Sequence, residues 1–142
     1  MCIIFLAYRQ HPQYPLILLA NRDEFYARPA APAQIWEDAS QILAGRDLLF
    51  GGTWLGVTKT GKFAAVTNYR DPNAARASRS RGELVKDFLL SRKTPPAFLE
   101  SIESKSHEYS GFNLLVGEIN QESDEIAYCS NRAAEIKILW IN

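Results

Sequence analysis

The chain has 142 residues, of which 46% are hydrophobic and 23% are charged, and its formal net charge is zero. This length suits one domain, and the balanced charge gives no general attraction to nucleic acid or to an anionic membrane. The apolar runs are shorter than the roughly 20 residues of a membrane-spanning helix, and no positive stretch typical of a signal peptide precedes the first one. We therefore expect a cytoplasmic protein with a small-molecule substrate or ligand, no nucleic-acid partner and no membrane insertion.

The first third of the chain predicts a β-hairpin followed by a loop. Residues 2–8 are rich in Ile and aromatic side chains and predict a strand. Residues 16–20 predict a second strand, buried on both faces because its apolar run is continuous, and the short connection makes the two a hairpin. Residues 25–36 contain two prolines and are expected to form a loop.

The rest of the chain predicts two more strands, two helices and three last strands. Residues 53–58 and 63–69 flank a turn at Gly61, since glycine adopts turn conformations that other residues avoid. Two segments have apolar residues at helical spacing, and three further strands follow. Their ranges are 82–92 and 94–109 for the helices, and 111–119, 125–131 and 134–142 for the strands.

This order of elements favours an α+β fold. Strands come first, then two helices, then strands again, which indicates a largely antiparallel sheet with helices on one side. The last strand is expected to leave an open sheet edge, and such an edge can pair with a second copy of the chain. A homo-oligomer formed through residues 134–142 is therefore possible from the pattern.

Cys2 follows directly on the initiator Met1. Aminopeptidases remove Met1 when the next side chain is small, and Cys2 then carries both a thiol and a free α-amine. Because the ordinary pKa of an α-amine is about 7.7–8.0, part of it is unprotonated near neutral pH and can take the thiol proton. One residue then supplies the nucleophile and the base.

The polar run Asn21-Arg22-Asp23-Glu24 ends the second predicted strand. Pairing in the hairpin would bring the first three of these residues beside Cys2. There the charge of Arg22 can favour a thiolate, and Asp23 can hold the α-amine through a charge-assisted hydrogen bond. Asn68, at the end of the strand 63–69, is a candidate donor to an oxyanion.

Each of these features also has an ordinary structural interpretation, which spacing alone favours. A cysteine in an apolar run is most often a small buried hydrophobe, as we expect for Cys129, and a charged run after a strand is most often a turn. The two cysteines and two histidines stand at scattered positions without the spacing of metal ligands. We therefore expect neither a metal site nor a cofactor.

A basic segment and a tryptophan leave alternatives open. Arg70, Arg76, Arg79 and Arg81 form either a lid or anion-binding loop for a carboxylate or phosphate, or a solvated loop, and the solvated loop is favoured. Trp54, which stands among glycines, belongs either to the core, as most such tryptophans do, or to the wall of a substrate pocket.

Six segments in one order carry a resemblance to a known family: MCIIFLAY, LANRDEFYARP, GGTWLGV, FAAVTNYRDP, SRGELVKDFL and GFNLLVG. The chain resembles the NRDE family, also called the transport and Golgi organization protein 2 family, over nearly all of residues 1–142, as a single domain. That family is similar to N-terminal nucleophile hydrolases, so the resemblance implies an αββα sandwich. Family members continue beyond the position of Asn142 with a GLSN-like stretch, which implies that the sandwich is incomplete in this chain and truncated on its C-terminal side.

The resemblance also implies roles for individual residues. The similar choloylglycine hydrolases and penicillin V acylases cleave amide bonds with an N-terminal cysteine, an arginine and aspartate pair, and an asparagine or tyrosine at the oxyanion. By motif, Cys2 matches the nucleophile, Arg22 and Asp23 match the pair, although two residues separate it in the hydrolases, and Asn68 matches the oxyanion position. We expect a second set of residues to contact the substrate: Asn21, Trp54, Tyr69 and Arg70.

The implied activity is that of an N-terminal-cysteine amidohydrolase acting on a non-peptide C–N bond. Eukaryotic members of the family are associated with Golgi organization, lipid and coenzyme A metabolism, and haem trafficking. The alternative is therefore a non-catalytic protein that binds or carries haem or an acyl-coenzyme A-like ligand. The motif residues serve both functions, so the sequence does not separate them.

Overall fold

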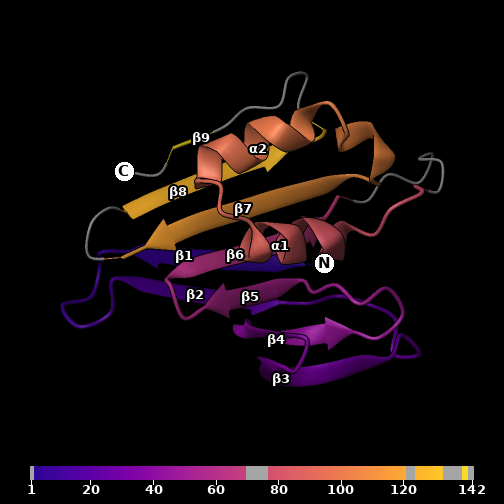
Figure 1. The fold of residues 1–142 in the computed structure, drawn as a ribbon, viewed down its shortest axis with the longest axis horizontal. Coiled ribbons are helices and arrows are strands. Elements are labelled where there is room, and N and C mark those ends of the chain that lie inside the picture. The colour runs from indigo at the N-terminus through magenta and orange to yellow at the C-terminus, as the bar shows by residue number, and fades with distance from the viewer. Residues whose placement is uncertain (1, 70–76, 121–123, 133–138, 141–142) are drawn as a thin grey trace.

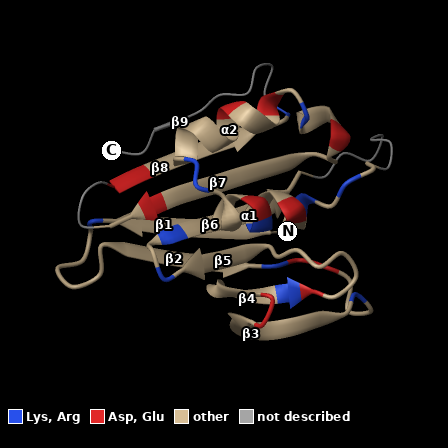
Figure 2. Cartoon of the chain, in the orientation of Figure 1, with Lys and Arg blue, Asp and Glu red and all other residues tan. Residues whose placement is uncertain are grey.

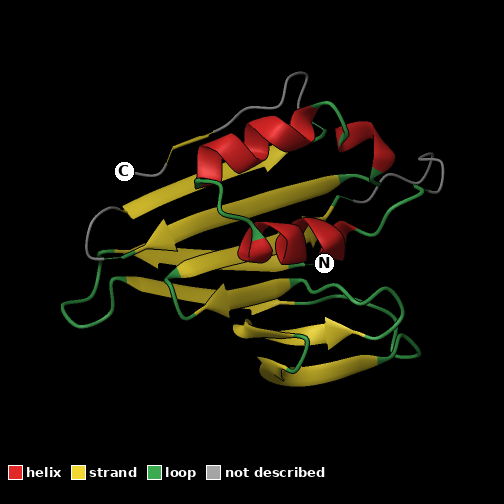
Figure 3. Cartoon of the chain, viewed as in Figure 1, coloured by secondary structure: helices red, strands yellow, loops and turns green. Residues whose placement is uncertain are grey.

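A computed structural model describes residues 2–69, 77–120, 124–132 and 139–140. Met1, Arg70, Arg76 and Asn142 lie outside these ranges. The described chain forms three layers (Figures 1 and 3): two α-helices with a short 3-10 helix (Ser106–Glu108) after them, a seven-stranded sheet, and a two-stranded sheet behind it. The predicted α+β class, with an antiparallel sheet and helices on one side, is confirmed.

The large sheet is antiparallel throughout, and its strands lie in chain order. At the turn between its third and fourth strands, Gly61 has a φ of 94°, which is the conformation for which glycine was predicted there. The strands are β3 (Ala30–Trp36), β4 (Ala39–Asp47), β5 (Leu55–Thr58), β6 (Lys62–Asn68), β7 (Phe112–Ile119), β8 (Asp124–Ser130) and β9 (Leu139–Trp140).

Strand β3 corrects the loop that was predicted for residues 25–36. Pro32 lies inside this strand, where the pairing with β4 shifts register between Ala31 and Gln34. Because β3 is the edge strand of the sheet, a residue without an N–H is tolerated at this irregularity. Trp36 at the end of β3 is buried, and its indole N–H donates to the Ala44 carbonyl at 3.2 Å.

The helices cover one face of the large sheet and form the main core with it (Figure 1). They are α1 (Arg81–Leu90) and α2 (Pro95–Glu103), and neither is long and apolar enough to cross a membrane. The residues predicted from their spacing are all buried: Leu84, Val85, Phe88, Leu89, Phe98, Leu99 and Ile102. The Lys62 ammonium of β6 donates to the carbonyls of Ser91 and Lys93 at 2.9 and 2.7 Å, which ties this strand to the segment between the two helices.

The predicted hairpin lies on the opposite face of the large sheet. It consists of β1 (Ile3–Tyr8) and β2 (Leu16–Asn21), paired from Ile3 with Asn21 to Tyr8 with Leu16. Its inner face packs on Phe63, Leu115 and Ile126 of the large sheet.

The outer face of the hairpin corrects a second expectation, that β2 is buried on both faces. Phe5 and Leu19, which pair with each other, are 61% and 63% exposed. The two-stranded sheet therefore has one packed face, and among the described residues no layer covers the other.

Two leucines at the end of α1 test the assignment of its buried face. We expect Leu89→Ala to lower the free energy of unfolding by about 2–5 kcal/mol, because Leu89 is 3% exposed and its loss leaves a cavity in the core. Leu90→Ala is the matched control, since Leu90 is 44% exposed and the change in helix propensity is the same. Urea unfolding measures both, and equal losses would contradict the assignment.

Candidate functional site

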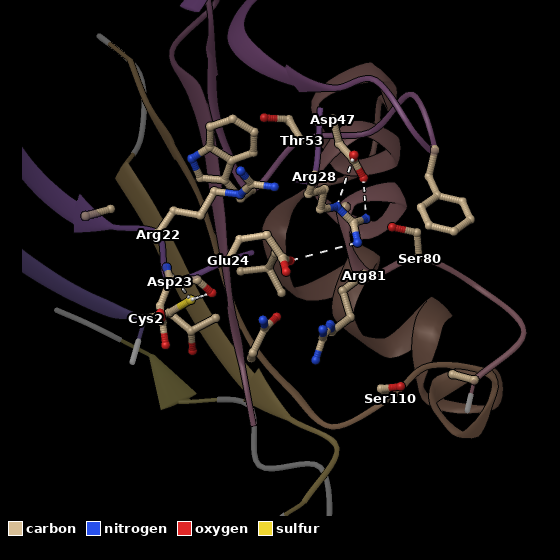
Figure 4. Close-up of a pocket in the computed structure, with 18 of the residues that line it drawn as sticks. Cys2, Arg22, Asp23, Glu24, Arg28, Asp47, Thr53, Ser80, Arg81 and Ser110 are labelled. Carbon is tan, nitrogen blue, oxygen red and sulfur yellow. Dashed lines mark hydrogen bonds and ion pairs between the residues drawn. The ribbon is translucent and has the colours of Figure 1, made fainter. Parts of the chain in front are cut away.

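A cavity of about 390 Å³ lies between the open end of the hairpin, the large sheet and the start of α1 (Figure 4). This volume is within the range of roughly 300–1,000 Å³ that is usual for small-molecule sites. The cavity brings together six of the residues singled out from the sequence: Cys2, Asn21, Arg22, Asp23, Trp54 and Asn68. Tyr69 is not among the residues that line it and is 48% exposed, and Arg70 lies outside the described residues.

The pairing of β1 with β2 places Cys2 against the peptide of Asp23. Ile3 pairs with Asn21, so the residue before β1 lies beside the residues that follow β2. The Asp23 N–H donates to Cys2 Sγ at 3.4 Å, and the thiol donates to the Asp23 carbonyl at 3.8 Å. The half-buried sulfur is thus held by backbone groups of the NRDE motif, and the N–H can stay bonded to it when the thiol loses its proton.

Arg22 lies over the indole ring of Trp54. Its guanidinium carbon is 4.2 Å from the centroid of the indole ring, a distance at which a cation is attracted to an aromatic face. Both residues line the cavity, so the pair forms a flat, positively charged part of its wall.

Asn68 is the last residue of β6 and is held in the sheet by its pairing with Phe112. Its side chain is half-buried and lines the cavity. Within the described part of the chain, its amide has no hydrogen-bond partner, although its neighbour Thr67 accepts a bond from Asn113. The Asn68 amide therefore retains its donors for a molecule in the cavity.

A fixed ion-pair network forms another wall. Arg28 donates to both carboxylate oxygens of Asp47 at 3.2 and 2.6 Å, and its guanidinium is 3.9 Å from the Glu24 carboxylate. These contacts raise the pKa of Arg28, chiefly through the hydrogen bonds to Asp47. Such a forked arginine–carboxylate pair has a specific geometry, so this side of the cavity is rigid and the charge of Arg28 is balanced by that of Asp47.

Charged residues of both signs also gather where α1 begins (Figure 2). Arg79 forms ion pairs with Glu83 at 2.8 Å and Glu108 at 3.3 Å. Arg81 is the first residue of α1, half-buried at the cavity wall, and it donates to the Gly111 carbonyl at 3.1 Å. The favoured interpretation of this segment as a solvated loop is therefore wrong for Arg79 and Arg81; Arg70 and Arg76 lie outside the described residues.

Sequence reasoning missed two residues of this cavity wall, Arg28 and Asp47. The pairing of Ala30 with Asp47 in the β3–β4 hairpin brings Asp47 beside Arg28, and this hairpin was hidden by the assignment of residues 25–36 to a loop. An arginine and an aspartate at the two open ends of a predicted hairpin would have been the signal.

The second cysteine lies in a different environment. Cys129 in β8 is fully buried in the main core, as predicted, and burial raises the pKa of its thiol to about 12. Among the described residues, no three His, Cys, Asp or Glu side chains are placed to hold a metal ion together.

Fold and site together define an α+β protein with a cysteine thiol in a polar cavity at the end of a hairpin. A profile of the family described as "Transport and Golgi organisation 2" matches residues 1–141. The chain therefore belongs to the Transport and Golgi organisation 2 family.

Similar proteins are known from several animals. A Bos taurus protein named "Transport and Golgi organization protein 2 homolog" is 44% identical over 93% of this chain and 51% of its own length. The Homo sapiens homolog is 42% identical over the same shares, and "Transport and Golgi organization protein 2" of Drosophila melanogaster is 33% identical over 87% of this chain and 48% of its own. The chain spans about half the length of the curated relatives it matches.

The contrast between the two cysteines can be measured in the native protein. We expect a disulfide exchange reagent at pH 8 to titrate one thiol in the folded chain and two in denaturant, because Cys129 is buried and burial raises the pKa of its thiol to about 12. Cys2→Ser should abolish the native reaction, and Cys129→Ser should leave it unchanged. Reaction of both thiols at similar rates in the folded protein would contradict this structure.

Proposed function

We propose that this chain carries an N-terminal-cysteine amidohydrolase site that cleaves a non-peptide C–N bond of a small molecule. The observation that carries the proposal is the contact of Cys2 Sγ with the Asp23 N–H at 3.4 Å, inside a cavity of ligand size. A hydrogen bond donated to the sulfur favours the thiolate, which is the nucleophilic form.

The layering of the chain supports the same proposal. N-terminal nucleophile hydrolases are αββα sandwiches, and the described residues form helix, sheet and sheet layers in this order. The exposed Phe5 and Leu19 lie on the side where such a sandwich has its second helical layer. We infer that the chain corresponds to the first three layers of this architecture.

The first step of the proposed reaction forms a thioester. Removal of Met1 frees the Cys2 α-amine, which takes the proton of the thiol, and the thiolate then adds to the amide carbonyl carbon. The carbonyl oxygen becomes an oxyanion that receives a hydrogen bond from the Asn68 amide. When the C–N bond breaks, the leaving nitrogen takes the proton held by the α-amine, and the acyl group remains on Sγ.

The second step restores the enzyme. The neutral α-amine takes a proton from water, and the hydroxide that forms adds to the thioester carbonyl. The C–S bond breaks, the thiolate recovers the proton, and a carboxylic acid leaves. The sum is one amide and one water converted to one acid and one amine, with Asp23 proposed to orient the α-amine through both steps.

Binding without chemistry is the second candidate, with haem or an acyl-coenzyme A-like molecule as ligand. The stack of Arg22 on Trp54 favours it, because a flat cationic wall can hold an anionic or planar ligand and takes no part in the two steps above. Retention of Met1 in the purified protein would support this candidate, because the α-amine of Cys2 would then remain in a peptide bond.

Amide hydrolysis can be tested with a variant that keeps the thiol and blocks its amine. We expect the chain with Met1 removed to release nitroaniline from members of a panel of small p-nitroanilides. Insertion of one alanine between Met1 and Cys2 places the Cys2 amine in a peptide bond. It should lower kcat/KM by at least about 100-fold, which is the effect expected when a general base is lost.

The intact mass of each protein verifies its N-terminus, and Cys2→Ala gives the background rate. Equal turnover by the inserted variant and the parent chain would show that the α-amine of Cys2 is not the base. A parent chain with a free N-terminal cysteine that cleaves no anilide faster than Cys2→Ala would leave the binding function as the better account.

A further inference from the structure

We propose that Arg81 anchors a carboxylate or phosphate group of the molecule that reacts at Cys2. This assignment rests on the proposed function, because the reaction at Cys2 is part of it. The substrate would then be an amide that bears an acidic group. The anion preference of the cavity is a separate property, which can be measured without turnover.

Four arginines and three carboxylates line the cavity, and three of the arginines are engaged. Arg28 is paired with Asp47, Arg79 is paired with Glu83 and Glu108, and Arg22 is stacked on Trp54. The ion pairs balance the charges of Arg28 and Arg79, and the indole ring covers one face of the Arg22 guanidinium.

Arg81 differs from the other three. Arg81 donates a hydrogen bond to a neutral group, the Gly111 carbonyl, at 3.1 Å, and among the described residues no carboxylate forms an ion pair with it. The side chain extends from α1 into the cavity (Figure 4). Since a guanidinium has five N–H donors in a planar fork, it can still bind an oxyanion with two of them.

The backbone around Arg81 is fixed by a close approach of two glycines. The Thr53 N–H donates to the Gly82 carbonyl at 3.2 Å, and a Cβ on Gly52 would lie 2.5 Å from the Gly82 carbonyl carbon. Only glycine at position 52 permits this contact, which locks the first turn of α1 to the β4–β5 connection. Arg81 is therefore held ready before a ligand arrives, and less ordering entropy is lost on binding.

The local electrostatics agree with an anionic ligand. Burial lowers the pKa of Arg81 and the charge of Arg28 acts with it, while the charges of Glu24 and Cys2 act in the opposite direction. A partly desolvated cation without an ion pair is costly, and a bound oxyanion would offset that cost. The cavity wall is also the N-terminal end of the ten-residue α1, where the helix dipole favours negative charge.

Alkylation of Cys2 by two matched reagents tests the anchor. Iodoacetate and iodoacetamide differ in charge and hardly in size. The second-order rate constant of iodoacetate at Cys2, divided by that of iodoacetamide, therefore measures how strongly the cavity attracts an anion. We expect this ratio to fall about ten-fold in Arg81→Gln, as for one charge interaction at intermediate effective dielectric. Glutamine retains a donor for the Gly111 carbonyl, and any change in the thiolate fraction cancels in the ratio.

Arg79→Gln is the matched control, because it removes one lining arginine whose charge is already paired. Its ratio should stay within about two-fold of the parent value, and Arg81→Lys should keep most of the preference. If circular dichroism shows Arg81→Gln to be unfolded, the salt dependence of the parent protein replaces it as the test. The ratio for the parent must then fall as the salt concentration rises, because salt screens the attraction between a cation and an anion. An unchanged ratio in folded Arg81→Gln, an equal fall in Arg79→Gln, or a salt-independent parent ratio would each overturn the anchor.

Protection from iodoacetamide distinguishes the two kinds of anion. Inorganic phosphate and acetate are compared at equal ionic strength, and the anion whose protection of Cys2 is lost in Arg81→Gln names the group. Protection by neither, or protection that persists in the variant, overturns the anchor. If the ratio depends on Arg81 but the protein cleaves no amide, the proposed reaction is refuted and the anchor stands. If the protein cleaves amides but the ratio is unchanged in Arg81→Gln, the anchor is refuted and the proposed reaction stands.

Discussion

The pairing of Ile3 with Asn21 is the constraint on which the cavity depends. This register is set by packing, since Ile4, Leu6 and Leu18 of the hairpin lie on the large sheet. A slip by one residue would turn these side chains outward and present Phe5 and Leu19 to the sheet instead. It would also move Cys2 away from the Asp23 peptide, so the position of the thiol follows from the hydrophobic face of the hairpin.

The remaining walls come from segments that are distant in the sequence and are held by different forces. Trp54 immediately precedes β5, Arg28 and Asp47 meet across the open end of the β3–β4 hairpin, and Arg81 begins α1. The Arg28–Asp47 fork matches its own charges and gives rigidity. Arg81 is fixed by backbone contacts instead, so its charge remains available. The site thus combines the thiol of Cys2, the Arg28–Asp47 ion pair, and Arg81, a cation without a carboxylate partner among the described residues.

Much of the fold could be predicted, because the patterns concerned are local. The helical spacing of Leu84, Val85, Phe88 and Leu89 indicated the buried face of α1, and two apolar runs with a short connection indicated the hairpin that brings Cys2 to Asp23. Strand β3 could not be predicted in the same way, since Pro32 is tolerated only because the strand is an edge, and edge position depends on the whole sheet.

The charged residues of the site were harder to predict than its elements. The stacking of Arg22 on Trp54 and the pairing of Arg79 with Glu108 join residues about 30 positions apart, and nothing in the local pattern distinguishes a paired arginine from a free one. From sequence alone, a segment with several arginines is therefore predicted to be a solvated loop. The tertiary contacts show which of these arginines are paired with carboxylates. Arg81 became distinctive only by comparison with its paired neighbours.

The claim that Cys2 is an N-terminal nucleophile is tested most directly by trapping the acylated protein. An acid quench during turnover of an amide, followed by mass spectrometry of the first proteolytic peptide, reads both the N-terminus and the modification. The mechanism predicts a peptide that begins at Cys2 and carries the acyl group on sulfur, removable by hydroxylamine. A peptide that begins at Met1, or product formation without any acyl group on Cys2, would contradict it.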